Sequence, residues 1–175
     1  MNLWCFIIFF IIMSPVIQQN KNFIFSVIMV IHNSGKYLDQ SIKSLLNQTI
    51  NFEVIQIILI NDGSVDNSEE LCLKYKKLYS NNIIYINTIN KGVSKAKNFG
   101  MRFAKGEFIN FLDSDGFWDY KAFEYVLNFF KNQSNINFVS GRLKFFESKN
   151  DYNSIDYKFY KTRIINLNKE YTLIL

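Results

Sequence analysis

The chain has 175 residues, of which 49% are hydrophobic and 17% aromatic, enough to bury the core of one ordinary domain and to exclude intrinsic disorder. Its formal net charge is +5, but the lysines are scattered, so the charge does not indicate a nucleic-acid partner. The two cysteines, Cys5 and Cys72, have the spacing of neither a disulfide framework nor a zinc site.

The N-terminal segment is apolar and uncharged from Leu3 to Met13, and a polar patch follows at 18–22. The run is shorter than the roughly 20 apolar residues that usually span a bilayer. It also lacks the basic residues that begin a signal peptide. A degenerate signal or anchor, an arm on a membrane surface and an extension outside the fold all remain open. We treat residues 1–22 as a leader, favour membrane association, and expect a cytoplasmic protein.

From Phe23 onward, short apolar runs alternate with amphipathic segments. The apolar runs predict strands over residues 23–31, 54–60, 83–87 and 108–112. Apolar side chains at three- and four-residue spacing predict helices over residues 37–48 and around residues 71–79, 93–103 and 123–130. This alternation predicts an α/β fold with right-handed crossovers and a mainly parallel sheet sandwiched by helices.

Two further patterns concern single elements. Asp66 and Glu69 stand three residues apart before the second helix, as in a capping box. After residue 136 the helical spacing stops, and the pattern predicts one or two strands over 138–146 and another over 157–165.

Several common catalytic motifs are absent from the sequence. The seven glycines form neither G-x-G-x-x-G nor G-x-x-x-x-G-K-[ST], which disfavours a dinucleotide oxidoreductase and a P-loop NTPase. One histidine without paired cysteines disfavours structural zinc, and no G-x-S-x-G elbow supplies a hydrolase nucleophile.

Polar residues follow each predicted strand, where an open α/β sheet binds its ligands. These positions are His32 and Asn33, Asn61 and Asp62, residues 90–92, and residues 113–115. The last group ends the run FINFLDSDG with Asp113 and Asp115 on either side of one serine. Such carboxylates suit Mg²⁺ or Mn²⁺ carrying substrate phosphates, although a solvated surface turn is the alternative for the motif alone.

Five ordered segments resemble the nucleotide-binding half of family 2 glycosyltransferases: FSVIMVIHN, SIKSLLNQT, IILINDGSVDNS, NKGVSKAKNFG and AKGEFINFLDSDG, between Phe23 and about Phe130. The resemblance implies a glycosyltransferase A-type (nucleotide-diphospho-sugar transferase) fold with Mn²⁺ or Mg²⁺ as cofactor. It also implies inverting transfer of a sugar from a nucleotide-diphosphate donor, with a UDP-sugar expected. The implied acceptor is a glycan or a lipid-linked molecule in surface polysaccharide or glycolipid synthesis.

The resemblance also implies roles for single residues. Asp62 would contact the nucleobase, Lys97 stands where the family often has an arginine near the nucleotide, and Asp115 would bind the metal. A metal beside Lys97 would stabilise the charge that develops on the leaving diphosphate. The substrate-binding candidates are His32, Asn33, Asp62, Lys97, Asp113 and Ser114, and the metal candidates are Asp113 and Asp115.

Structural roles compete with these assignments. Asp62 could be only a turn residue before Gly63, Lys97 could be a solvated helix charge, and His32 could stack on the base or, as we favour, fill a strand end. Ser64 and Asp66 are assigned to turn and cap structure.

The chain departs from the family pattern at four positions. Val30 and His32 replace the usual proline and tyrosine, Ser34 replaces a commonly acidic residue, and Gly116 stands where a second aspartate is frequent. The change at Ser34 is expected to weaken nucleotide contacts, and Gly116 alters the surroundings of the Asp-x-Asp pair.

No catalytic residue is assigned, although an inverting transfer needs a base near the acceptor hydroxyl. No carboxylate after residue 115 stands in a motif that identifies it as that base. We divide the folded region into a donor-binding half over 23–131 and a partial acceptor side over 132–175, and expect that the chain is truncated, with a fold incomplete at its C-terminus. The alternative is a non-catalytic remnant that binds nucleotide-sugar without transfer, and a nucleotidyltransferase ranks last.

Overall fold

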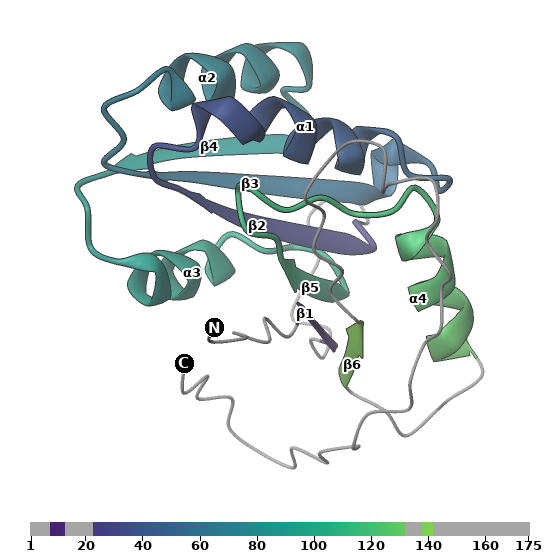
Figure 1. Cartoon of the computed structure of the whole chain (residues 1–175). Helices are drawn as coiled ribbons and strands as arrows, with labels where there is room; N and C mark the ends of the chain where they lie inside the picture. Colours follow the sequence, from purple (N-terminus) through teal and green to yellow (C-terminus); the bar gives the residue numbers. More distant parts are fainter. Residues whose placement is uncertain (1–7, 13–22, 132–137, 142–175) are drawn as a thin grey trace, which may run out of the picture.

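The computed structural model describes residues 8–12, 23–131 and 138–141 (Figure 1). Six strands form one sheet in the order β4-β3-β2-β5-β1-β6. The neighbours β4, β3, β2 and β5 run parallel. The strands are β1 (Ile8–Ile12), β2 (Phe25–Ile31), β3 (Ile55–Asp62), β4 (Ile83–Thr88), β5 (Phe108–Phe111) and β6 (Phe138–Gly141). The predicted α/β fold with a mainly parallel sheet is therefore confirmed.

Helices cover both faces of this sheet. They are α1 (Gly35–Leu46), α2 (Ser68–Leu78), α3 (Val93–Met101) and α4 (Ala122–Lys131), and a short 3₁₀ helix η1 (Phe52–Val54) precedes β3. Figure 1 shows α1 and α2 on one side of the parallel strands and α3 on the other. Each predicted helix is present, and its bounds differ from the predicted range by a few residues.

The core consists of two clusters, one on each face of the sheet. Along β2, Val27 and Met29 belong to the cluster under α1 and α2, whereas Ile28 belongs to the cluster under α3. Successive side chains of a strand point to opposite faces, so a strand covered by helices on both sides must be apolar throughout. The continuous apolar runs in the sequence have this cause.

A glycine sets how closely α3 packs against the sheet. A Cβ atom at Gly100 would lie 2.6 Å from the side chain of Ile60 and 2.7 Å from that of Ile28. Any side chain at this position would therefore push α3 away from the sheet, because atoms in a packed core cannot approach so closely.

The strand order reverses between β2 and β5. The chain passes from β2 to β3 and β4 on one side of β2, and β5 then returns to pair with β2 on its other side. At such a reversal the connections leave a crevice at the carboxyl ends of the two central strands. This edge carries the residues after Ile31 and Phe111.

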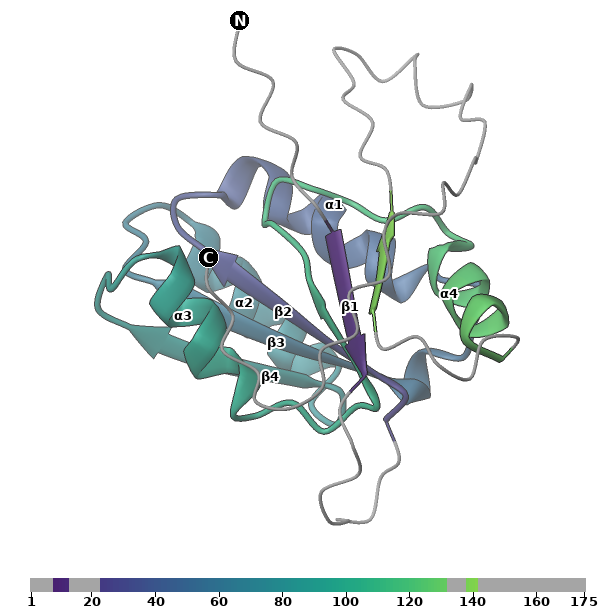
Figure 2. The same ribbon diagram turned by 90° about the horizontal axis from the view of Figure 1, so that it is seen from below.

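The expected membrane association of the N-terminal segment is wrong. Residues Ile8–Ile12 form β1, which pairs antiparallel with β5 and β6 (Figure 2). In the described ranges, no helix is long and apolar enough to cross a membrane. A short apolar run can satisfy its backbone groups in a sheet, and here it covers the edge that β5 would otherwise expose. The sequence pattern predicts a leader over residues 1–22, whereas in the structure five of these residues, Ile8–Ile12, belong to the sheet.

The predicted capping box at α2 does not form. Asp66 accepts a hydrogen bond from the backbone N–H of Ser68 at 3.0 Å, but Glu69 turns toward β4. There its carboxylate accepts bonds from the Tyr85 hydroxyl at 3.1 Å and the Asn87 amide at 3.2 Å. Strand β6 covers the start of the strand region predicted at 138–146, and the strand predicted at 157–165 lies outside the described residues.

Candidate functional site

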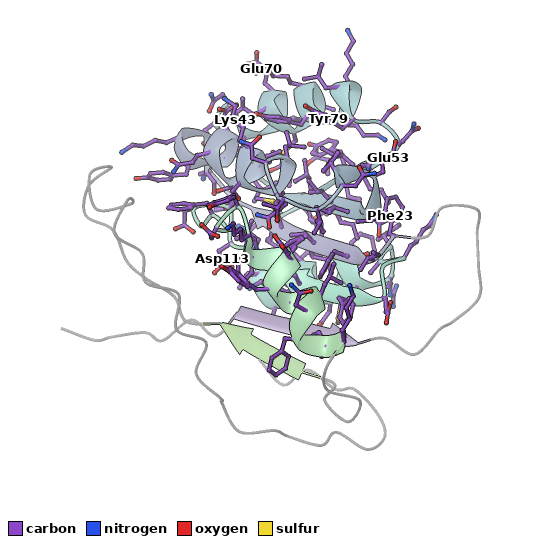
Figure 3. The ribbon with its side chains drawn as sticks, turned by 90° about the vertical axis from the view of Figure 1, so that its right-hand side faces the viewer. Phe23, Lys43, Glu53, Glu70, Tyr79 and Asp113 are labelled. Carbon is purple, nitrogen blue, oxygen red and sulfur yellow. The ribbon has the colours of Figure 1, made fainter. Side chains whose placement is uncertain are left out.

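The candidate residues gather where the strand order reverses. His32 and Asn33 follow β2, Asp62 ends β3, and Asp113 follows β5 by two residues. In Figure 3, Asp113 lies on the opposite side of the view from Phe23, which precedes β2. The parallel strands therefore bring residues far apart in the sequence to one edge of the sheet.

Asp62 is almost fully buried, with 2% of its surface exposed. One carboxylate oxygen accepts hydrogen bonds from the backbone N–H of Lys91 at 2.9 Å and the Thr88 hydroxyl at 3.3 Å. The other accepts from the backbone N–H of Gly92 at 3.0 Å. Gly92 has φ 86°, a conformation that favours glycine, so the loop can turn its N–H groups toward the carboxylate. Asp62 thus holds the loop before α3, a contact that we did not foresee from the sequence.

His32 is exposed and links the ends of β2 and β3. Its Nδ1 lies 2.8 Å from the backbone carbonyl oxygen of Asp62. A carbonyl oxygen only accepts, so Nδ1 carries the hydrogen and donates it. The Asn33 amide lies 3.3 Å from Nε2. The ring is therefore oriented at the mouth of the site rather than packed into the core.

Asn33 shapes the turn after β2. It has φ 52°, which asparagine tolerates better than most residues. Its N–H donates to the Ser64 hydroxyl at 3.0 Å, and its side-chain oxygen accepts from the N–H of Val65 at 2.8 Å. These bonds join the turns after β2 and β3, and they agree with a structural role for Ser64.

Lys97 reaches the aspartate pair from α3. Its ammonium lies 3.1 Å from a carboxylate oxygen of Asp113, and the two side chains are 17% and 45% exposed, respectively. The same ammonium lies 5.8 Å from the centre of the Phe111 ring. Lys97 is therefore not a freely solvated helix charge. A partly exposed ion pair of this kind contributes about 1 kcal/mol or less, so an incoming anion or cation can replace either partner.

Asp113 and Asp115 lie on a tight turn. The N–H of Gly116 donates to the backbone carbonyl of Asp113 at 2.9 Å, which closes the turn. Asp115 is exposed, and among the described residues its carboxylate has no hydrogen-bonding or ionic partner. Within the same ranges, no three acidic, histidine or cysteine side chains cluster as a metal site. Two carboxylates nevertheless fit Mg²⁺ or Mn²⁺, because such ions take their remaining ligands from water and substrate phosphates.

A row of polar side chains on α1 supports this turn. The Ser41 hydroxyl is shared between the carbonyl oxygens of Ser114 at 2.8 Å and Gly116 at 2.5 Å. One helical turn later, the Ser44 hydroxyl accepts from the N–H of Trp118 at 3.1 Å. Beyond the helix end, the Gln48 amide donates to the backbone carbonyl of Asp119 at 2.6 Å and accepts from the backbone N–H of Phe123 at 3.1 Å. Helix α1 therefore holds the segment from the turn to the start of α4.

Ser114 faces α1 as well. It is 8% exposed, and its hydroxyl lies 2.6 Å from that of Ser34, where an acidic residue is usual in the family that the sequence resembles. Sequence reasoning missed the support by Ser41, Ser44 and Gln48. The signal was a polar stripe at positions i, i+3 and i+7, which continues the helical spacing beside the apolar stripe.

Asp66, in the turn region after β3, and Cys72, in the core beneath α2, have shifted pKa values. Although burial acts to raise the pKa of Asp66, hydrogen bonds from Ser68 and Gly35 hold it below the ordinary value of 3.8. Burial raises the pKa of the Cys72 thiol to about 12. Cys72 is therefore protonated and unreactive at neutral pH, since only the thiolate is a good nucleophile.

The sequence of the chain is similar to that of a known protein family. The chain matches the family model "Glycosyl transferase family 2" over residues 26–174. Minor teichoic acid biosynthesis protein GgaB of Bacillus subtilis (strain 168) is 44% identical over 154 residues, which cover 87% of this chain and 17% of GgaB. The chain thus spans less than a fifth of that relative's length.

Two solved structures resemble the fold. S. aureus TarS 1-349 in complex with UDP-GlcNAc has a TM-score of 0.58 and 27% identity, covering 63% of this chain and 32% of that chain. Mannosyltransferase PcManGT from Pyrobaculum calidifontis, in complex with GDP-Man and Mn²⁺, has a TM-score of 0.59 and 14% identity, covering 66% and 34%. The second likeness concerns the fold alone. Together they confirm the predicted fold class.

Proposed function

Because the chain belongs to glycosyl transferase family 2, we propose that it binds a nucleotide-diphosphate sugar and transfers the sugar, with inversion, to a cell-surface polymer. The observation that carries the proposal is the pair Asp113 and Asp115, with Lys97 beside it, where the strand order reverses. The similarity to TarS bound to UDP-GlcNAc supports a UDP-sugar as the donor. The similarity to GgaB supports a teichoic acid or a related surface polysaccharide as the acceptor.

A divalent cation would be held by Asp113 and Asp115. When bound, it would supply positive charge that stabilises the leaving diphosphate. Lys97 lies within reach of the same place and would exchange its bond to Asp113 for a phosphate oxygen. The weak, partly exposed ion pair would hold the Asp113 carboxylate in position until the donor arrives.

The nucleotide would lie against the turns after β2 and β3. Asp62 positions the loop before α3 and retains acceptor capacity, because a carboxylate has about four lone pairs and three are used. We assign that capacity to an N–H of the nucleobase. His32 and Asn33 are assigned to the mouth of the same pocket, and Ser114 to support of the metal turn.

A second candidate function is donor binding without transfer. It is favoured by the contacts of two carboxylates that follow the metal turn in the described region. Asp119 accepts a bond from the N–H of Lys121 at 2.9 Å, as a cap of α4, and Glu124 accepts from the Thr49 hydroxyl at 2.7 Å. Both act in structural contacts. Neither is assigned as the base that an inverting transfer requires.

One experiment separates these functions. Thermal stabilisation by UDP is measured with Mn²⁺ and with a chelator, and turnover is measured as UDP release from a UDP-sugar, for the wild type and Asp115→Asn. Glu70→Gln, an exposed change on α2, is the matched control. Metal-dependent stabilisation with turnover that is lost only in Asp115→Asn supports transfer. Stabilisation without turnover supports the binding module, and no response to any nucleoside diphosphate contradicts both.

A further inference from the structure

A basic groove runs along α3, beside the end of β4. It encloses about 290 Å³. Its lining includes Thr88 from the end of β4, Lys91 from the loop that follows, and Lys95, Phe99 and Arg102 from the helix region. Lys97, which faces Asp113, does not line it. The groove is therefore separate from the Asp113–Asp115 turn.

The groove is positively charged without local compensation. Lys91, Lys95 and Arg102 are all exposed, and the lining contains no acidic side chain. In the described part of the chain, the ion pairs are Lys43–Asp39 and Lys97–Asp113, so none of the three groove cations is paired. Unpaired charges of one sign in a concave surface attract a ligand of the opposite sign.

The spacing of the cations favours an extended anion. Lys95 and Arg102 are separated by seven residues, which corresponds to about 10 Å along a helix. Lys91 precedes the helix and extends the row at its N-terminal end. One phosphate cannot contact groups spread over this length, whereas a chain of phosphates can contact them in turn.

The lining between the cations suits a carbohydrate or polyol. Phe99 is 38% exposed and packs edge-to-face on Phe103, with ring centres 5.3 Å apart, which holds the ring in place. Asn98 adds an exposed amide to the lining. An apolar ring face and an amide can contact the C–H and O–H groups of a polyol between two phosphates.

The groove shares its loop with the proposed donor pocket. The Thr88 hydroxyl and the Lys91 N–H, both from lining residues, donate to the buried carboxylate of Asp62. A polymer in the groove would therefore run next to the donor site rather than on a remote surface.

We propose that this groove binds the phosphodiester-linked polyol chain of the polymer that the enzyme glycosylates. The inference rests on the proposed function, because it identifies the class of acceptor. A nucleic acid presents phosphates too, but single strands are held by stacking successive bases on several aromatic rings. Of the described residues that line the groove, only Phe99 is aromatic.

The test compares two charge reversals in the full chain. Lys95→Glu with Arg102→Glu alters the groove, and Lys74→Glu with Lys77→Glu on α2 makes the same change of net charge at exposed positions elsewhere. Binding of fluorescent poly(glycerol phosphate) is followed by anisotropy at several salt concentrations. The groove variant should bind at least about tenfold more weakly, with a salt slope reduced by about one to two, and the α2 variant should stay within about twofold of the wild type.

Two further probes assign the outcome. Neutral dextran should not compete, and a thymidine oligonucleotide of equal charge should bind more weakly than poly(glycerol phosphate). Equal losses in the two variants, or equal binding of the oligonucleotide, would overturn the proposal. Stabilisation by UDP with Mn²⁺ is measured on the same samples and should be unchanged in the groove variant. If UDP with Mn²⁺ does not stabilise the wild type, the proposed function is contradicted, while the polymer-binding measurement still tests the groove.

Discussion

The two aspartate sites at the edge of the sheet differ in how their carboxylates are used. Asp62 is buried and receives three hydrogen bonds from the next loop, whereas Asp115 is exposed and, among the described residues, unpartnered. A carboxylate whose lone pairs are mostly engaged by the protein organises the fold, and one that is open can take a cation. The same residue type thus serves stability at one strand end and is available for chemistry at the other.

Removing the open carboxylate should affect activity most. Asp115→Asn should reduce sugar transfer by roughly hundredfold or more, because one charged ligand of the phosphate-bound metal is lost. Its urea unfolding midpoint should stay close to that of the wild type, since surface substitutions change the free energy of unfolding by about 0.5 kcal/mol or less. UDP release and urea titration check the two parts. An equal loss of stability would show that the carboxylate has a structural role after all.

Removing the buried carboxylate of Asp62 should affect folding most. Asp62→Asn presents an N–H₂ group to backbone N–H donors and should reduce the free energy of unfolding by about 1–3 kcal/mol. Urea titration monitored by fluorescence measures this change. Asp115→Asn serves as the isosteric control, and identical midpoints for the two variants would contradict the contrast.

The support of the metal turn by α1 can be removed without touching a carboxylate. Ser41→Ala should destabilise the chain by about 1–2 kcal/mol, because the buried carbonyl oxygen of Ser114 and the part-buried one of Gly116 lose the hydroxyl that they share. It should also raise the Mn²⁺ concentration needed for stabilisation by UDP, whereas Ser41→Thr restores the hydroxyl and should recover much of that response. A metal response unchanged in Ser41→Ala would argue that the turn holds its shape alone.

The smallest effect is expected from Asp66 in acid. Its pKa is lowered in the folded state, so its contribution to stability is present above the ordinary pKa of 3.8 and is lost as the pH falls through the folded value. Asp66→Asn should therefore flatten the stability profile below about pH 4. Urea unfolding midpoints measured between about pH 2 and about pH 6 check this expectation. If Asp66→Asn and the wild type lose stability equally as the pH falls below about 4, Asp66 does not have this role.

The strands and helices of the central domain could be predicted because the spacing of their apolar residues indicates each element. Along β3, every residue is buried, and the four residues from Ile57 to Ile60 form an uninterrupted apolar run before Asn61. Along α1, Leu38, Ile42 and Leu45 recur at helical spacing and are all buried. Burial on one or two faces leaves a repeating pattern, and a pattern can be read without coordinates.

The role of β1 was not predictable in this way. Its partner β5 lies about a hundred residues later in the chain, and no local period specifies a long-range antiparallel pairing. The apolar run from Leu3 to Met13, which contains β1, fits a strand, a leader and a membrane-resting arm equally well. Only the sheet edge distinguishes them.

The candidate site was predictable in position but not in its contacts. The strand ends predict that Asp62 and Asp113 lie at one edge of the sheet, and the family resemblance adds Lys97 from a helix. The structure joins Asp113 and Lys97 directly. The bonds of Asp62 to the next loop depend on Gly92, whose conformation no side-chain pattern reveals. The Ser34–Ser114 contact likewise joins residues 80 positions apart.

The close approach at Gly100 also fixes the position of Lys97 on α3. Helix α3 lies against Ile28 and Ile60 with no room for a methyl group, so its distance from the sheet is set by a missing atom. Lys97 stands on that helix less than one turn earlier, and its ammonium must span the gap to Asp113. Gly100, which has no side chain, thus sets the distance that the long side chain of Lys97 spans to reach Asp113.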